Sequence, residues 1–226
     1  MKRLSHPLAV LAVVLLGLTG CSSSPTRAPD PEPTLVPFPA DFPSAPDLLM
    51  ARFQAAYVGR DSVALAAMLR PAFVTLLQQS TRNTFPDVGE TLNRAEQVRI
   101  TGRMFRRQDL FDPNYNLVPA ITSIQVTTFQ RVGIWSQSPG NDQIPNAWNA
   151  LFSLQVIFNR GPSFSPMMTA GNMRFYMTVR DSTALGETHP YYQLAGVVDL
   201  TDAVAMGPAD KGSESSSWGS IHALFR

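Results

Sequence analysis

The sequence predicts an α+β protein in which N-terminal helices pack on a curved antiparallel sheet. Residues 44–105 carry apolar side chains at the three- and four-residue spacing of amphipathic helices. After Phe111, four runs alternate apolar with other side chains at a period of two, which is typical of half-buried antiparallel strands. Because 44% of the residues are hydrophobic and 15% are charged, the chain can build a core.

Two helices are expected first. Ser44 and Asp47 form a variant capping box, so a helix is predicted from Ser44 to about Gly59. Its apolar positions share one face and are Leu49, Phe53 and Ala56. Asp61 can cap a second helix that ends at Pro71.

A short strand and a third helix follow. Residues 72–78 are apolar and predict a strand, and Pro86 and Gly89 mark a loop. Asn93 and Glu96 then have capping-box spacing, which predicts a third helix to Phe105.

The second half of the chain predicts four strands. They are centred on residues 121–135, 151–158, 173–180 and 191–200. Breakers mark the turns between them at residues 140–145, 159–162 and 183–190.

This order of elements resembles the NTF2-like fold, which ketosteroid isomerase and the SnoaL-type polyketide cyclases share. The likeness covers residues 45–226 and contains no catalytic signature. The residues that carry it are Phe53-Gln54-Ala55-Ala56-Tyr57 with Arg60-Asp61, Leu65 to Pro71-Ala72-Phe73, Arg94-Ala95-Glu96 with Met104-Phe105, Arg174 to Val179, Gln193 to Thr201, and Trp218-Gly219-Ser220-Ile221 to Phe225-Arg226. The tail is similar to that of small exported NTF2-like lipoproteins.

The resemblance implies a cone whose concave apolar face wraps the helices and leaves a pocket at the wide end. The side chains expected on that face, as core or as pocket lining, are Phe152, Leu154, Val156, Phe158, Met173, Phe175 and Met177. The outer face would carry Arg174, Tyr176, Thr178 and Gln193. Relatives dimerise through that face, so a homodimer is expected there, although a solvated sheet face explains the same pattern.

The N-terminus reads as an export signal. Lys2 and Arg3 precede an apolar run over residues 7–19 that is shorter than the roughly 20 residues of a membrane span. Leu18-Thr19-Gly20-Cys21 then resembles the lipobox of bacterial lipoproteins, and Cys21 is the single cysteine. The resemblance implies cleavage before Cys21, a diacylglyceryl thioether on its sulfur, and N-acylation. The alternative is an ordinary signal peptide with an incidental cysteine.

The same resemblance implies a location and a domain layout. Ser22, rather than aspartate, follows the cysteine and favours the outer membrane, on its periplasmic side. Residues 1–20 would be the signal peptide, 21–45 the lipidated cysteine with a tether, and 46–226 the NTF2-like domain. Eight prolines in residues 22–46 favour an extended spacer that reaches at most roughly 80 Å, although a proline-rich partner motif is the alternative.

Charge and cysteine content exclude several functions. Loss of Lys2 and Arg3 with the signal leaves 16 basic and 17 acidic residues. A near-neutral domain without basic clusters gives no electrostatic reason to expect nucleic-acid binding. With Cys21 acylated, no thiol remains for catalysis, a disulfide or a metal site.

Few residues suit catalysis. His189 and His222 lack metal-ligand spacing, so both are expected to be ordinary loop or surface residues, and no cofactor motif is present. Asp199 interrupts an apolar strand and is the one weak catalytic candidate, but its alternation phase opposes Leu194 and Leu200 and predicts an outward side chain. We therefore expect a non-catalytic lipoprotein domain that binds a partner or a small apolar ligand. The alternative is an NTF2-like isomerase, dehydratase or hydrolase.

Overall fold

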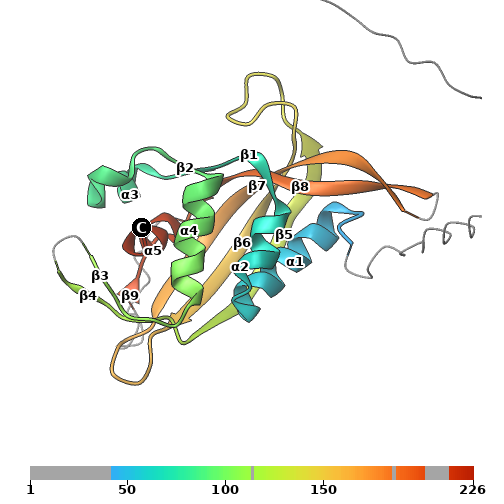
Figure 1. Cartoon of the computed structure of the whole chain (residues 1–226). Helices are drawn as coiled ribbons and strands as arrows, with labels where there is room; N and C mark the ends of the chain where they lie inside the picture. The colour runs from blue at the N-terminus through green and yellow to red at the C-terminus, as the bar shows by residue number, and fades with distance from the viewer. Residues whose placement is uncertain (1–41, 113–114, 185–186, 202–213) are drawn as a thin grey trace, which may run out of the picture. The chain divides into compact units, whose positions relative to one another are not determined.

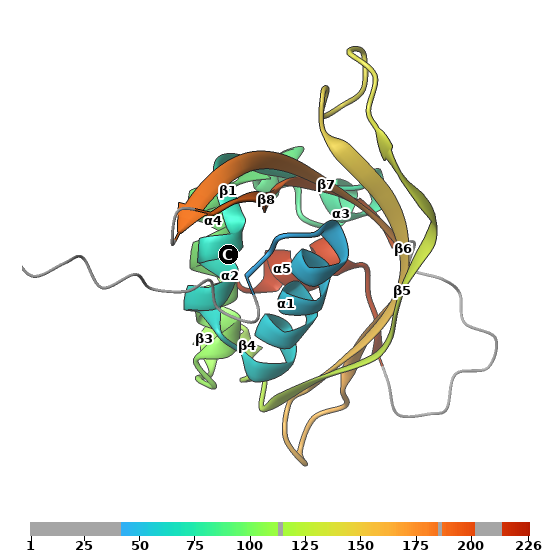
Figure 2. The ribbon, with the colours of Figure 1, turned by 90° about the vertical axis from the view of Figure 1, so that its right-hand side faces the viewer.

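The structure is a computed structural model that describes residues 42–112, 115–184, 187–201 and 214–226. The predicted signal peptide, Cys21 and most of the tether lie outside these residues. Within them, helices pack against the concave side of a strongly curved sheet, as Figures 1 and 2 show from two directions. The predicted α+β cone is confirmed.

The main sheet has the strand order β2-β1-β8-β7-β6-β5. Its strands are β1 (Leu69–Leu76), β2 (Thr91–Asn93), β5 (Ser123–Gln137), β6 (Trp148–Asn159), β7 (Met167–Ala184) and β8 (Glu187–Leu200). All neighbours on this path pair antiparallel except β1 and β8, which are parallel, and the short β9 (Glu214–Ser215) pairs in parallel with β7. The four predicted long strands are thus consecutive elements of one sheet.

Two of the predicted helix starts are confirmed. Asp61 caps α2 (Ser62–Met68) by accepting a hydrogen bond from the Ala64 amide. Asn93 and Glu96 form the complete capping box of α4 (Arg94–Phe105).

The start of α1 (Pro46–Gly59) differs from the prediction. Its N-cap is Ala45, which makes no side-chain cap, because Pro46 occupies the first helical turn where proline is favoured. Ser44 therefore lies outside the helix. Asp47 instead accepts a hydrogen bond from the indole nitrogen of Trp135 at 3.0 Å.

Two segments predicted to be irregular contain helices. The loop around Pro86 contains α3 (Gln79–Thr84) and the 3-10 helix η1 (Pro86–Val88), and the tail contains α5 (Trp218–Leu224). β1 already begins at Leu69 and runs through Pro71. The turn predicted over residues 183–190 is also too long, because β7 and β8 stay paired to Ala184 and Glu187.

Between α4 and β5 the chain forms a separate small hairpin of β3 (Leu110–Phe111) and β4 (Leu117–Val118). Figure 1 shows it beside the C-terminal end of α4. Within the described residues, every helix falls short of the length and apolar character that crossing a membrane requires.

The core lies between the concave face of the sheet and the helices. All seven side chains predicted for that face are buried, namely Phe152, Leu154, Val156, Phe158, Met173, Phe175 and Met177. The outer face differs from the expectation at Tyr176, which is 1% exposed. Residues from the β5–β6 connection cover it: Ala147 packs against Tyr176, and Asp142 accepts a 2.9 Å hydrogen bond from its hydroxyl.

Candidate functional site

The interior of the cone is filled by side chains of the protein itself. Two gaps of about 10 Å³ each lie inside it, and Phe53, Tyr57 and Trp218 line both. A gap of this size holds about one water molecule. Neither of these two gaps has room for a small-molecule ligand.

The C-terminal helix α5 supplies much of this filling. Figure 2 shows it inside the curve of the sheet, behind α1 in that view. The ring centroid of Trp218 lies 4.9 Å from that of Tyr57 and 6.1 Å from that of Phe158. Ile221 and Phe225 are likewise buried. The side chains of α5 thus fill part of the interior of the cone.

Asp199 faces inward, contrary to the alternation prediction, and is 2% exposed, whereas Leu200 is 42% exposed. A β-bulge in β8 is the reason. Tyr176 pairs with Gly196 and Met177 with Leu194, so Ala195 is an extra residue in the register. An extra residue reverses the alternation beyond it, and Asp199 consequently lies on the same face as Leu194.

Every hydrogen bond recorded for the Asp199 carboxylate comes from this chain. Oδ1 accepts from Gln78 Nε2 at 3.1 Å, from the Thr201 amide at 3.0 Å and from the Thr201 hydroxyl at 2.5 Å. Oδ2 accepts from the Gly219 amide, in the first turn of α5, at 2.7 Å. Burial raises the pKa of the carboxyl, and the hydrogen bonds from Thr201, Gly219 and Gln78 oppose that shift. This geometry makes Asp199 an anchor for α5.

His222 is buried in the core, so the prediction of a surface residue is wrong. It lies on α5, in a tail for which the sequence predicts no helix. Its Nδ1 donates to the Trp218 carbonyl at 3.0 Å, and Nε2 accepts from the Tyr57 hydroxyl at 3.2 Å. Burial lowers the pKa of His222 to about 4 and raises the pKa of Tyr57. Both groups are therefore neutral at pH 7.

His189 lies in strand β8 rather than in a loop, and its Nε2 is 3.2 Å from the Glu187 carboxylate. The structure does not bring it together with His222 or Asp199 in any recorded contact. In the described part of the chain, no group of three or more His, Cys, Asp or Glu side chains could hold a metal ion.

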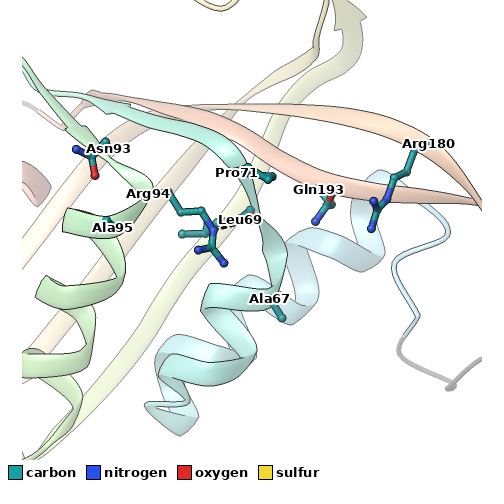
Figure 3. A pocket seen from close by; sticks show the side chains of 8 residues that line it. All are labelled: Ala67, Leu69, Pro71, Asn93, Arg94, Ala95, Arg180 and Gln193. Carbon is teal, nitrogen blue, oxygen red and sulfur yellow. Dashed lines mark hydrogen bonds between the residues drawn. The ribbon is translucent and has the colours of Figure 1, made fainter. Parts of the chain in front are cut away.

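An open surface cleft of about 580 Å³ is shown from close by in Figure 3. Its polar lining consists of Asn93, Arg94, Arg180 and Gln193, and none of the described residues that line it is acidic. Arg94 donates to the carbonyls of Ala66 at 2.9 Å and Leu69 at 3.1 Å, which holds its guanidinium at the wall.

Arg180 enters the same cleft from β7. Its guanidinium carbon lies 4.9 Å from the centroid of the Tyr191 ring, a cation–π arrangement that holds the group in place. The sequence alone does not reveal this cleft, because its residues come from α2, β1, β2, α4, β7 and β8 and share no motif.

A second open hollow, of about 490 Å³, has Asp199 in its wall together with Gln78, Arg82 and Glu90. The guanidinium of Arg82 and the carboxylate of Glu90 form an ion pair of 2.5 Å. The carboxylates of this hollow are thus already engaged with groups of the same chain.

No protein-family model and no curated protein matches this chain. Among solved structures, a conserved protein from Planctomyces limnophilus DSM 3776 aligns with a TM-score of 0.42 and 12% identity, over 68% of this chain and 90% of that chain. An NTF2-like protein of unknown function in nutrient uptake from Rhodospirillum rubrum ATCC 11170 aligns with a TM-score of 0.34 and 9% identity, over 67% and 93%. Likeness at this level carries no functional argument, and the cone rests on the chain's own sheet and helices.

Proposed function

We propose that this protein is an exported lipoprotein, held at the periplasmic side of the outer membrane by lipid on Cys21, whose NTF2-like domain binds a partner and catalyses no reaction. The filled cone is the observation that carries the second half of this proposal. Because its interior gaps measure about 10 Å³ each, we expect the domain to bind its partner through its surface.

The sequence supports the anchor. A short apolar run ends at Leu18-Thr19-Gly20-Cys21, and a proline-rich stretch follows. Two or three acyl chains hold a protein stably at a membrane, whereas one chain binds marginally. The tether would leave the domain free to meet partners within roughly 80 Å of the lipid.

The cleft of Figure 3 is the best-supported binding surface. Arg94 and Arg180 offer guanidinium groups, and Asn93 and Gln193 add amide groups. Guanidinium groups pair bidentately with carboxylates, so the cleft suits a partner segment that carries acidic side chains.

The enzyme alternative has less support. Its best residue, Asp199, is inward and buried, as an acid catalyst would be, but its four recorded hydrogen bonds hold the chain's own groups. Asp199 borders the open hollow of about 490 Å³, but a catalytic base needs a substrate atom within hydrogen-bond reach, and four hydrogen bonds from this chain already occupy its carboxylate.

The anchor is tested with a Cys21→Ser variant expressed in a bacterial host. The wild-type chain should incorporate labelled palmitate and fractionate with membranes, and C21S should lose the label and the membrane fraction. Ser22→Ala is the matched control and should keep both. A C21S protein that remains unprocessed but is labelled like the wild type would contradict the anchor.

The cleft is tested with a photo-crosslinking amino acid at Gln193 in living cells. We expect a defined crosslinked product that Arg180→Glu abolishes, because the variant reverses the charge of the cleft wall. The control places the same amino acid at the exposed Gln125 of β5. Equal products from both positions, or a small apolar molecule that co-purifies with the domain in native mass spectrometry, would refute surface recognition.

A further inference from the structure

Helix α4 presents a row of arginines to solvent. Arg99, Arg103 and Arg106 follow one another at four and three residues, which places them on one face of the helix. The opposite face is buried through Ile100 and Met104. Arg107 follows directly and is exposed, as Arg106 is.

Most of these charges have no partner among the residues that the structure describes. Within the described part of the chain, Arg99, Arg106 and Arg107 form no ion pair or side-chain hydrogen bond, and Arg103 donates to the main-chain carbonyl of Arg226. Glu96, the acidic residue of α4, takes part in the capping box, and its carboxylate lies 3.4 Å from the guanidinium of Arg226. Among the described residues, Arg99, Arg106 and Arg107 therefore carry positive charge without a partner, whereas Arg103 is held by the main chain of Arg226.

The acidic side chains that follow α4 accept hydrogen bonds from nearby groups of the β3–β4 region. Asp109 accepts a hydrogen bond from the Ala120 amide at 2.8 Å. Asp112 accepts from the main-chain and side-chain nitrogens of Asn116, at 2.8 and 2.9 Å. These contacts hold the β3–β4 hairpin in place.

That hairpin exposes apolar side chains beside the arginines. Phe111 is 68% exposed, Tyr115 is 88% exposed and Leu117 is 45% exposed. Figure 1 shows β3 and β4 next to the C-terminal end of α4, where Arg106 and Arg107 lie in the chain. We call Arg99, Arg103, Arg106, Arg107, Phe111 and Tyr115 the basic–aromatic surface.

We propose that the basic–aromatic surface docks on an anionic phospholipid bilayer, so that the domain lies against the membrane surface in a defined orientation. Guanidinium groups bind headgroup phosphates bidentately, and exposed aromatic rings are favoured at the boundary between headgroups and acyl chains. The arginines alone would also suit an acidic protein or a nucleic acid, and the neighbouring apolar side chains favour a lipid interface over both. This proposal rests on the proposed lipid anchor, which would hold the domain close to a membrane.

The test uses the mature chain with Cys21→Ser, which carries no lipid, and vesicles of phosphatidylcholine with or without 30% phosphatidylglycerol. We expect flotation with the anionic vesicles and little with neutral ones. Each arginine near an anionic surface contributes about a fivefold factor in partitioning. Arg99→Gln/Arg106→Gln/Arg107→Gln should therefore lower the partition coefficient at least tenfold, and Phe111→Ser/Tyr115→Ser should lower it further.

The matched control removes the same charge elsewhere, as Arg70→Gln/Arg131→Gln/Arg174→Gln on strands β1, β5 and β7, and should change binding less than threefold. Circular dichroism and thermal melts verify that all variants fold. Equal losses in both triple variants, binding that ignores lipid charge, or binding to a DNA duplex without binding to vesicles would overturn the proposal. The Cys21→Ser chain used in this test carries no lipid. The result of the vesicle experiment is therefore independent of the palmitate labelling that tests the anchor.

Discussion

At the scale of single residues, His222 shows how burial decides the role of a titratable group. Its Nδ1 donates to a main-chain carbonyl and its Nε2 accepts from Tyr57, so both nitrogens are satisfied in the neutral form. A second proton on Nε2 would face the Tyr57 oxygen in a site without solvent. The imidazole therefore acts as a packing and hydrogen-bonding group of the core.

This arrangement predicts a pH-dependent stability. The pKa of His222 is about 4 when folded, below its ordinary value of 6.5, so the unfolded chain binds more protons between these values and stability is lost as pH falls through that window. The full shift corresponds to about 3 kcal/mol. Urea unfolding at pH 7.0 and 4.5 measures it.

His222→Gln is the matched variant, because glutamine keeps polar groups without a titratable ring. Its free energy of unfolding should be lower than that of the wild type at pH 7 and should change less between the two pH values. If wild type and H222Q lose equal stability on acidification, the buried imidazole does not cause the pH dependence.

At the scale of elements, α5 depends on anchors outside itself. Seven residues are too few for a stable isolated helix, so tertiary contacts must hold it. Asp199 accepts from the Gly219 amide, and Thr201 accepts from the Trp218 amide at 2.8 Å. Ser217 caps the helix by accepting from the Ser220 amide at 3.0 Å.

Gly219 allows the closest of these approaches. A Cβ there would lie 2.9 Å from Asp199 Oδ2, from a Leu77 methyl and from Thr81 Oγ1, all inside van der Waals contact. We predict that Gly219→Ala displaces α5 and costs about 1–3 kcal/mol of folding free energy, as overpacking does. Chemical denaturation measures the loss.

Gly102 provides the control within α4, since a Cβ added at this position would have no neighbouring atom within 4 Å. Gly102→Ala should stabilise the protein by up to about 1 kcal/mol through helix propensity. A G219A protein as stable as G102A would show that the Asp199–Gly219 contact does not constrain α5.

At the scale of the whole molecule, the cone is closed by its own C-terminus. Trp218 contacts aromatic rings from α1, β6 and its own helix, with centroids 4.8 to 6.5 Å apart. It is 4% exposed and is the largest side chain that α5 inserts.

Removal of this side chain should open a cavity. Trp218→Ala is expected to cost about 3–5 kcal/mol. Indole should then raise the melting temperature of the variant in a concentration-dependent way, because a ligand that binds the folded state alone stabilises it. Thermal melts with and without indole give the answer.

Trp148→Ala is the control, because Trp148 is 40% exposed on β6 and leaves no enclosed space. Indole should leave its melting temperature unchanged. Equal responses of the two variants would mean that indole does not occupy the space of Trp218.

The succession of helices and strands can be read from the sequence because local chemistry determines it. The Asn93–Glu96 capping box and the Asp61 cap depend on neighbouring residues, and they lie where predicted. The predicted start of α1 is wrong through a local effect, since the preference of Pro46 for the first turn outweighs the serine cap.

The site cannot be read in the same way. Counting alternation assigns Asp199 an outward side chain, and the bulge at Ala195 is visible only in the register between β7 and β8. The net charge sums over the whole chain and therefore does not reveal the row of arginines on α4. The three- and four-residue spacing of Arg99, Arg103 and Arg106 is nevertheless present in the sequence.

By itself, the sequence determined the α+β class and the order of the main elements, because these follow from periodicity and capping. The resemblance to the NTF2-like fold assigned the seven alternating apolar side chains to the concave face. Only the tertiary structure decided that α5 packs inside the cone, that Asp199 and His222 turn inward, and that the arginines of α4 and the aromatic side chains of the β3–β4 hairpin are exposed. Those outcomes depend on contacts between residues far apart in the chain, such as the 165 positions that separate Tyr57 from His222. A bulge of one residue in β8 is enough to change which side chains meet.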